Sequence, residues 1–173
     1  MKKNIKFVAL ILCLTLISFC FAGCSKKQKN RYLDIKETAS TNNWEFSVQK
    51  AFYKEKISLP YTSSIYMEYE VKDANSTYLC IVLNAKNISK QGIKASEFAN
   101  VKLIIDKEYE YKTKVAVEDE ESGLAPATFI DIEPLRNKNI YYLVEIPKEY
   151  IKQKKPLEFK ISVDNDTYYY NYQ

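Results

Sequence analysis

The sequence predicts an all-β fold, a sandwich or a barrel, that follows a short N-terminal export segment. Segments in which apolar and polar residues alternate strictly recur along the chain, and this period of two is typical of strands with one buried face. Helical periodicity is scarce, and all five prolines fall at the edges of these segments, where strands tolerate them. Roughly eight such segments joined by short polar turns are typical of a β-sandwich or a β-barrel.

Residues 1–23 have the pattern of a secretory signal peptide. Lysines near the start give a positive charge, and residues 7–22 are almost entirely apolar. This apolar run is shorter than the roughly 20 residues that a membrane-spanning helix needs. It ends at the small residues Ala22 and Gly23. We therefore expect residues 1–23 to direct export and to be removed.

The residues Phe21-Ala22-Gly23-Cys24 resemble the lipobox of bacterial lipoproteins, with Phe21 where that family usually has Leu. In that family a diacylglycerol is added to the cysteine thiol, and a peptidase cleaves directly before the cysteine. The resemblance implies that lipid on Cys24, with acyl chains such as palmitate, holds the protein at the extracytoplasmic face of the cell membrane. The alternatives are an ordinary signal peptide or an uncleaved N-terminal anchor, and both also place the remaining chain outside the cytoplasm.

Residues 24–43 are interpreted as the lipidated cysteine followed by a flexible tether. They are mostly polar and sustain no apolar period. About 19 flexible residues have a root-mean-square reach of roughly 25 Å. We therefore expect the folded domain to begin at Trp44 and to stay near the membrane without a fixed orientation.

Strict alternation begins at Trp44 and predicts the strands of the domain. Residues 78–83 are apolar or aromatic at every position, so we expect a central strand that is buried on both faces. Residues 94–98 are expected to form one helical turn, and residues 148–154 either a short helix or a polar loop. The other expected strands cover residues 44–52, 65–71, 101–105, 109–117, 128–132, 140–146 and 157–163. The expected core contains Trp44, Phe46, Leu79, Ile81, Leu83, Leu103, Tyr142, Val144, Phe159 and Ile161.

Composition argues against several functional classes. The chain has no histidine, which is the commonest general base and metal ligand. Without residues 1–23 and with lipid on Cys24, only Cys80 is left, and its apolar surroundings indicate a small buried hydrophobe rather than a reactive thiol. The formal net charge of +4 then falls to about +1, which does not favour nucleic acid binding. We expect no cofactor, no metal and no nucleic acid partner.

Three stretches resemble a family of Gram-positive bacterial lipoproteins that carry an immunoglobulin-like extracellular domain of unknown function. Residues 78–87 (YLCIVLNAKN) look like the central strand of that family, which ends in Asn. Residues 96–111 (SEFANVKLIIDKEYEY) are similar to its strand, acidic turn and aromatic strand. Residues 132–147 are similar to its late strand, which closes on proline.

This resemblance covers about residues 44–165. It departs from the family at Leu135-Arg136-Asn137, where the family often has Gly. It implies an immunoglobulin-like β-sandwich at residues 44–173, outside the cytoplasm, and it implies no catalytic residues.

Tyrosines near the C-terminus are the first candidates for a binding surface. The chain has 15 tyrosines, and a row of them ends the sequence. Exposed tyrosines offer apolar area with a polar tip at low entropic cost, so we predict a possible binding surface at Tyr168, Tyr169 and Tyr170, beside a free edge of the last strand. The alternative is that these tyrosines only suit a strand.

Charged clusters are weaker candidates. Lys148, Lys152, Lys154 and Lys155 either orient the domain on anionic lipid or form a solvated loop. The acidic run at residues 118–121 either holds a cation or forms a solvated loop, and the latter is favoured because the run lacks the spacing of known calcium loops. Asp164-Asn165-Asp166 is interpreted as a hairpin turn.

These observations favour a noncatalytic binding or interaction module of the cell envelope. Its partner would be an extracellular protein or an envelope polymer. A serine or cysteine nucleophile would lack a histidine base in this chain. The competing hypothesis is an envelope enzyme, or an accessory subunit of an envelope enzyme or transporter.

Overall fold

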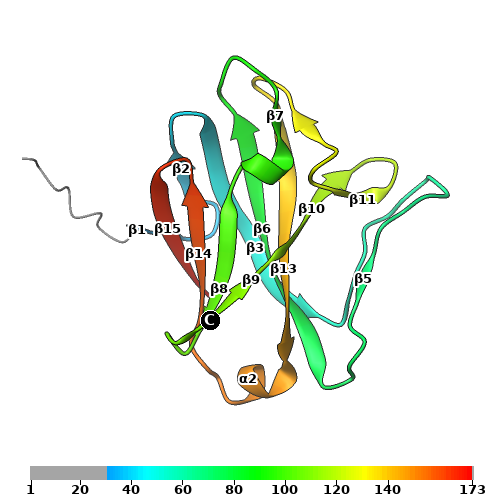
Figure 1. Cartoon of the computed structure of the whole chain (residues 1–173), viewed down its shortest axis with the longest axis vertical. Coiled ribbons are helices and arrows are strands. Elements are labelled where there is room, and N and C mark those ends of the chain that lie inside the picture. The colour runs from blue at the N-terminus through cyan, green and yellow to red at the C-terminus, as the bar shows by residue number, and fades with distance from the viewer. Residues whose placement is uncertain (1–30, 173) are drawn as a thin grey trace, which may run out of the picture.

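The computed structural model describes residues 31–172 of the chain (Figure 1). The predicted signal peptide, Cys24 and the first part of the predicted tether lie outside the described residues. No helix among residues 31–172 is long and apolar enough to span a membrane.

Two antiparallel sheets form a sandwich, with the five-stranded sheet toward the left of Figure 1. The six-stranded sheet has the order β11 (Gly123–Pro126), β10 (Lys114–Asp119), β13 (Asn137–Pro147), β6 (Ser76–Asn87), β3 (Trp44–Lys54) and β2 (Thr38–Ser40). The five-stranded sheet has the order β1 (Arg31–Tyr32), β15 (Asp166–Tyr172), β14 (Leu157–Val163), β8 (Asn100–Ile105) and β9 (Tyr109–Lys112). Among the described strands of this sheet, β1 alone runs parallel to its neighbour. The remaining elements are the short pairs β4 (Lys56–Ile57) with β5 (Tyr69–Glu70) and β7 (Ile93–Lys94) with β12 (Asp131–Ile132), the 3₁₀ turn η2 (Ala95–Glu97) and the helix α2 (Lys148–Lys152).

The strand order is that of an immunoglobulin-like sandwich, as predicted. In chain order β3, β6, β10 and β13 take the places of strands A, B, D and E in one sheet. Strands β8, β14 and β15 take the places of C, F and G in the other, with β9 as an additional edge strand. The connection from β9 to β10 passes from one sheet to the other, where the hydroxyl of Thr113 donates a 2.8 Å hydrogen bond to the carbonyl of Val101. The expected single strand 109–117 is therefore two strands.

The core between the sheets contains the predicted residues. Strand β6 lies between β3 and β13, which confirms the expected central strand. Its odd-numbered residues face the other sheet, and its even-numbered residues from Tyr78 to Val82 enter a second hydrophobic cluster on the outer face. The ten predicted core residues are all buried: Trp44, Phe46, Leu79, Ile81, Leu83, Leu103, Tyr142, Val144, Phe159 and Ile161.

A long arm, residues 55–71, covers part of that outer face and lies on the right of Figure 1. The expected strand at residues 65–71 is wrong except at β5, since Ile65 is 81% exposed and only Tyr69–Glu70 are paired. Gly123 allows the arm to approach: its φ is +71°, and a Cβ there would lie 2.7 Å from the carbonyl oxygen of Leu59. The expected strand at 128–132 is likewise reduced to β12.

The expected tether is too long, because residues 31–43 belong to the sandwich. The backbone N–H of Leu33 donates to the carbonyl of Tyr169 at 2.8 Å, and that of Lys36 donates to the carbonyl of Val48 at 2.7 Å. These bonds join the segment to β15 of one sheet and β3 of the other. Leu33 and Ala39 are buried in the core between the sheets. The folded domain therefore starts no later than Arg31 rather than at Trp44.

Candidate binding groove

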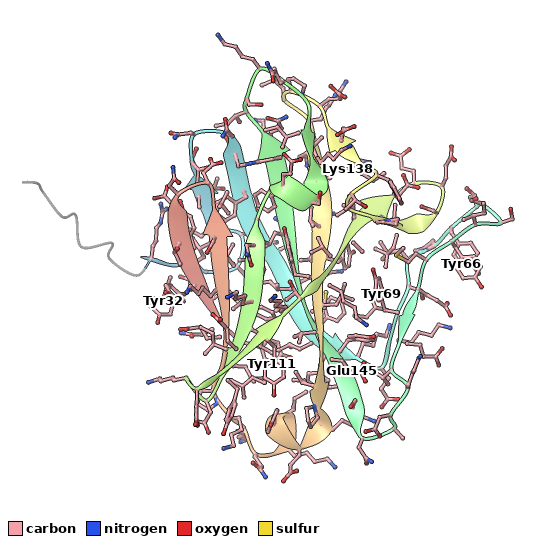
Figure 2. The ribbon with its side chains drawn as sticks, in the orientation of Figure 1. Tyr32, Tyr66, Tyr69, Tyr111, Lys138 and Glu145 are labelled. Carbon is pink, nitrogen blue, oxygen red and sulfur yellow. The ribbon has the colours of Figure 1, made fainter. Side chains whose placement is uncertain are left out.

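The three predicted binding tyrosines do not form one surface. Tyr168 is only 3% exposed, and its ring packs edge-on against Phe46 at 5.1 Å between ring centroids. Tyr170 faces the same side and packs against the core. Tyr169 faces outward and contacts Tyr32, which Figure 2 shows on the left flank of the molecule, at 5.5 Å between ring centroids. A strand turns successive side chains to opposite faces, so a surface shared by all three is excluded.

The edge of β15 that was predicted to be free is partly occupied. Strand β1 pairs with it at Tyr168 and Tyr169. Tyr32 was missed as a surface aromatic because it fell in the expected tether. Its hydroxyl donates a 2.9 Å hydrogen bond to Glu158.

A concave site does form at the lower end of the sandwich in Figure 1, where α2 follows β13. One hollow of about 600 Å³ lies between α2 and the ends of β3 and β6. A second hollow of about 430 Å³ lies on the other side of Tyr53 and Ile151 and is bordered by Tyr172. We call the two hollows together the α2 groove. They are lined by Tyr53, Lys54, Glu55, Lys56, Thr77, Lys148, Ile151, Lys152, Lys154, Lys155, Pro156, Leu157 and Tyr172.

Local structure fixes the position of α2. Pro147 ends β13 and precedes the first helical residue, where its fixed φ suits the approach to a helix. The backbone N–H of Lys148 donates to the carbonyl of Asn75 at 2.8 Å, and its ammonium group donates to the carbonyl of Ala74 at 2.7 Å and to Glu55. Ile151 packs against the core between the sheets. The helix is therefore held against the loop before β6.

The α2 groove carries surplus positive charge. Three of its lysines are paired: Lys148 with Glu55, Lys56 with Glu68 and Glu70, and Lys155 with Asp106. The other three lysines of the α2 groove form no ion pair within the part of the chain that the structure describes: Lys54, Lys152 and Lys154. The lysine cluster predicted from residues 148–155 thus lines a groove that Lys54 joins from β3.

An apolar ridge divides the two hollows. Tyr53 is 53% exposed, and its ring contacts that of Tyr172 edge-on at 6.5 Å between centroids. Burial raises the pKa of Tyr172, so its hydroxyl is neutral at physiological pH. Ile151 completes the ridge. A ligand in the groove would meet ammonium groups around rings and methyl groups, which suits an anion with an apolar or polyol backbone.

Two residues of the predicted acidic clusters, Asp119 and Asp164, have structural partners. Asp119 accepts hydrogen bonds from the backbone N–H and hydroxyl of Ser122 at 2.8 and 2.7 Å, and these bonds lower its pKa. Asp164 accepts from the backbone and side chain of Asn43 and lies in the turn between β14 and β15, as expected for a hairpin. Among the described residues, no three His, Cys, Asp or Glu side chains group as a metal site.

Cys80 lies in the second hydrophobic cluster on the outer face of the six-stranded sheet. It is fully buried, and burial raises the pKa of its thiol to about 12. The thiol is therefore protonated at neutral pH, which confirms the prediction of a small buried hydrophobe.

The comparisons with known proteins support the fold. No protein-family model matches the sequence, and no curated protein matches it. The structure is similar to a crystal structure of an uncharacterized β-sandwich protein from Clostridium difficile 630, with 22% identity, a TM-score of 0.77, and coverage of 86% of this chain and 97% of that one. It is also similar to a conserved hypothetical protein from Bacillus anthracis, with 14% identity, a TM-score of 0.54, and coverage of 82% and 95%. These likenesses show that the chain has a β-sandwich fold.

Proposed function

We propose that this protein is a noncatalytic binding module, held outside the cell membrane by lipid on Cys24, that binds a negatively charged envelope polymer in the α2 groove. The observation that carries the proposal is the groove itself. It is concave, it holds three lysines that form no ion pair with any described residue, and an apolar ridge that includes Tyr53 lies between its two hollows. The export signal and the residues up to Cys24 support an extracytoplasmic location.

The position of the N-terminal segment supports this arrangement. Arg31 lies beside Tyr168, at the end of β15 that is near the turn between β14 and β15. Tyr172, which borders the α2 groove, lies at the opposite end of β15. The chain from Cys24 to Arg31 spans at most roughly 25 Å when extended. A lipid on Cys24 would then favour orientations in which the α2 groove faces away from the membrane, toward the envelope.

Binding to a polyanion tests the proposal. The chain without residues 1–23 and with Cys24→Ser is titrated with inorganic polyphosphate, with neutral polyethylene glycol as the negative control. We expect the triple variant Lys54→Gln, Lys152→Gln, Lys154→Gln to bind polyphosphate about tenfold more weakly. The reason is that exposed charge pairs contribute about 0.5 kcal/mol each, so three of them sum to about 1.5 kcal/mol, which is close to a tenfold change in affinity.

A matched triple variant distinguishes the groove from general positive charge. Lys36, Lys90 and Lys112 are exposed residues away from the groove, and their change to Gln removes the same formal charge. We expect this control to bind polyphosphate within about twofold of the unmodified chain. Equal losses in the two triple variants, or no binding by the unmodified chain, would reject the α2 groove as a polyanion site.

A further inference from the structure

A row of polar side chains crosses the upper outer face of the six-stranded sheet, beyond the area that the arm covers. The strand register places Thr38, Ser47, Asn84 and Asn139 side by side on β2, β3, β6 and β13. Glu118 on β10 continues the row, because it accepts a hydrogen bond from Asn139. Asparagine is depleted in strands, so neighbouring asparagines on β6 and β13 are unusual.

The amides of this row form a chain of hydrogen bonds. Asn137 donates to Asn84 at 3.2 Å, Asn84 donates to Asn139 at 2.8 Å, and Asn139 donates to Glu118 at 2.7 Å. Each amide nitrogen carries two hydrogens and donates one of them within the row. The second N–H of each amide takes part in no hydrogen bond among the described residues, so it is available to a ligand. The row fixes the orientation of these donors before any ligand arrives.

The row forms the floor of a continuous groove. Two hollows, of about 380 and about 310 Å³, share Asn84 and Asn137. One extends to Lys138, which Figure 2 labels in the upper part of the molecule, and to Pro60 of the arm. The other extends to β2 and is bordered by Leu135. We call the two hollows together the amide groove.

We infer that the amide groove binds an uncharged oligosaccharide. Amide groups and a carboxylate in one row offer donors and acceptors to sugar hydroxyls, each of which both donates and accepts. With neighbouring strands about 4.8 Å apart, a row across five strands is about 19 Å long, enough for several sugar units. The apolar edges at Pro60 and Leu135 can contact the C–H faces of the rings.

The charges of the amide groove separate it from the α2 groove. Glu45 and Lys86 pair at 3.9 Å on one side. On the other side, the described residues that line the hollow include Glu118, Asp119 and Glu120 but one lysine, Lys138. An anionic polymer is thus disfavoured here. A protein partner is also disfavoured, because the centres of protein interfaces are apolar and this floor is polar. The inference is independent of the proposed polyanion site.

Titration with tetrasaccharides tests the inference. The full chain, purified in detergent, is titrated with cellotetraose and with the β-1,4-linked tetramer of N-acetylglucosamine, and binding is followed by calorimetry. We expect at least one of the two to bind, and Asn84→Val to weaken that binding at least tenfold. Valine suits a strand, so this variant is expected to fold, which a thermal melt verifies.

Two controls make the outcome decisive. Asn100→Val changes an exposed asparagine on β8 of the other sheet and should leave the affinity unchanged. The triple variant of the α2 groove should also bind the tetrasaccharide normally, so failure of one proposed site does not imply failure of the other. Absence of binding to both tetrasaccharides, or equal binding by a folded Asn84→Val chain, would overturn the inference.

Discussion

Replacement of Leu33 by alanine tests whether the N-terminal segment is part of the folded domain. Leu33 is 3% exposed and lies in the core between the sheets, where its segment joins β15 to β3. Removal of a buried leucine side chain costs about 2–5 kcal/mol. Because this site is near an edge and can partly collapse, we expect a loss of about 2–3 kcal/mol in the free energy of unfolding. For a domain of this size the melting temperature would fall by about 5–10 °C.

Ile35→Ala is the matched control for this prediction. Ile35 lies two residues away but is 50% exposed, so its truncation should change the free energy of unfolding by less than about 0.5 kcal/mol. Guanidinium denaturation of the three proteins gives both values from the midpoints and slopes. If Leu33→Ala were as mild as Ile35→Ala, the segment would be a tether that the domain does not need, and the assignment of residues 31–43 to the sandwich would be wrong.

Three further predictions concern the arm, the buried cysteine and the anchor. Gly123→Ala should lower the free energy of unfolding by about 1–3 kcal/mol, because a Cβ there combines a positive φ with a 2.7 Å approach to backbone. Hydrogen exchange should then speed up at Thr62 and Ser63, whose N–H groups bond to the carbonyl of Glu121. Unchanged exchange at these two residues would contradict the role of Gly123. Burial raises the thiol pKa of Cys80 from an ordinary value of 9.0 to about 12, so its contribution to stability is complete below pH 9 and is lost as the pH rises toward 12. Urea denaturation from pH 8 to 11 should show that the free energy of unfolding declines more steeply for the unmodified chain than for Cys80→Ala. Parallel declines would count against this prediction. Cys24→Ala should abolish lipid attachment and leave an uncleaved precursor or a released protein. Intact-mass analysis of the unmodified chain, extracted from membranes, shows whether Cys24 carries lipid. A mature N-terminus elsewhere, without lipid mass, would reject the anchor.

The sequence predicted the sandwich because a strand with one buried face shows that face in its own alternation of apolar and polar residues. The alternation in β3, β13 and β14 and the two apolar faces of β6 were sufficient for the core. The same logic failed at residues 65–71, where Met67, Tyr69 and Val71 pack on the second cluster. Their alternation reflects contact with the outer face of a sheet, and only Tyr69, in the two-residue strand β5, is part of a strand pair.

The candidate grooves depend on contacts between distant segments, which a single sequence does not contain. The lysines of residues 148–155 and the C-terminal tyrosines were visible as clusters, but Tyr53 and Lys54 join them only because β3 ends beside α2. The two buried side chains of residues 31–43, Leu33 and Ala39, are too few to show a period. The binding surface predicted at Tyr168, Tyr169 and Tyr170 left out the alternation of a strand, which turns Tyr168 into the core and Tyr169 outward.

Mapping of the polyanion contact by nuclear magnetic resonance tests the central claim most directly. The ¹⁵N-labelled chain is titrated with short-chain polyphosphate, and amide shifts are compared residue by residue. The account predicts that the largest shifts fall on Tyr53, Lys54, Ile151 and Tyr172, and that they shrink as salt is raised because exposed charges are screened. Shifts spread evenly over exposed lysines, or centred on another face of the sandwich, would contradict it.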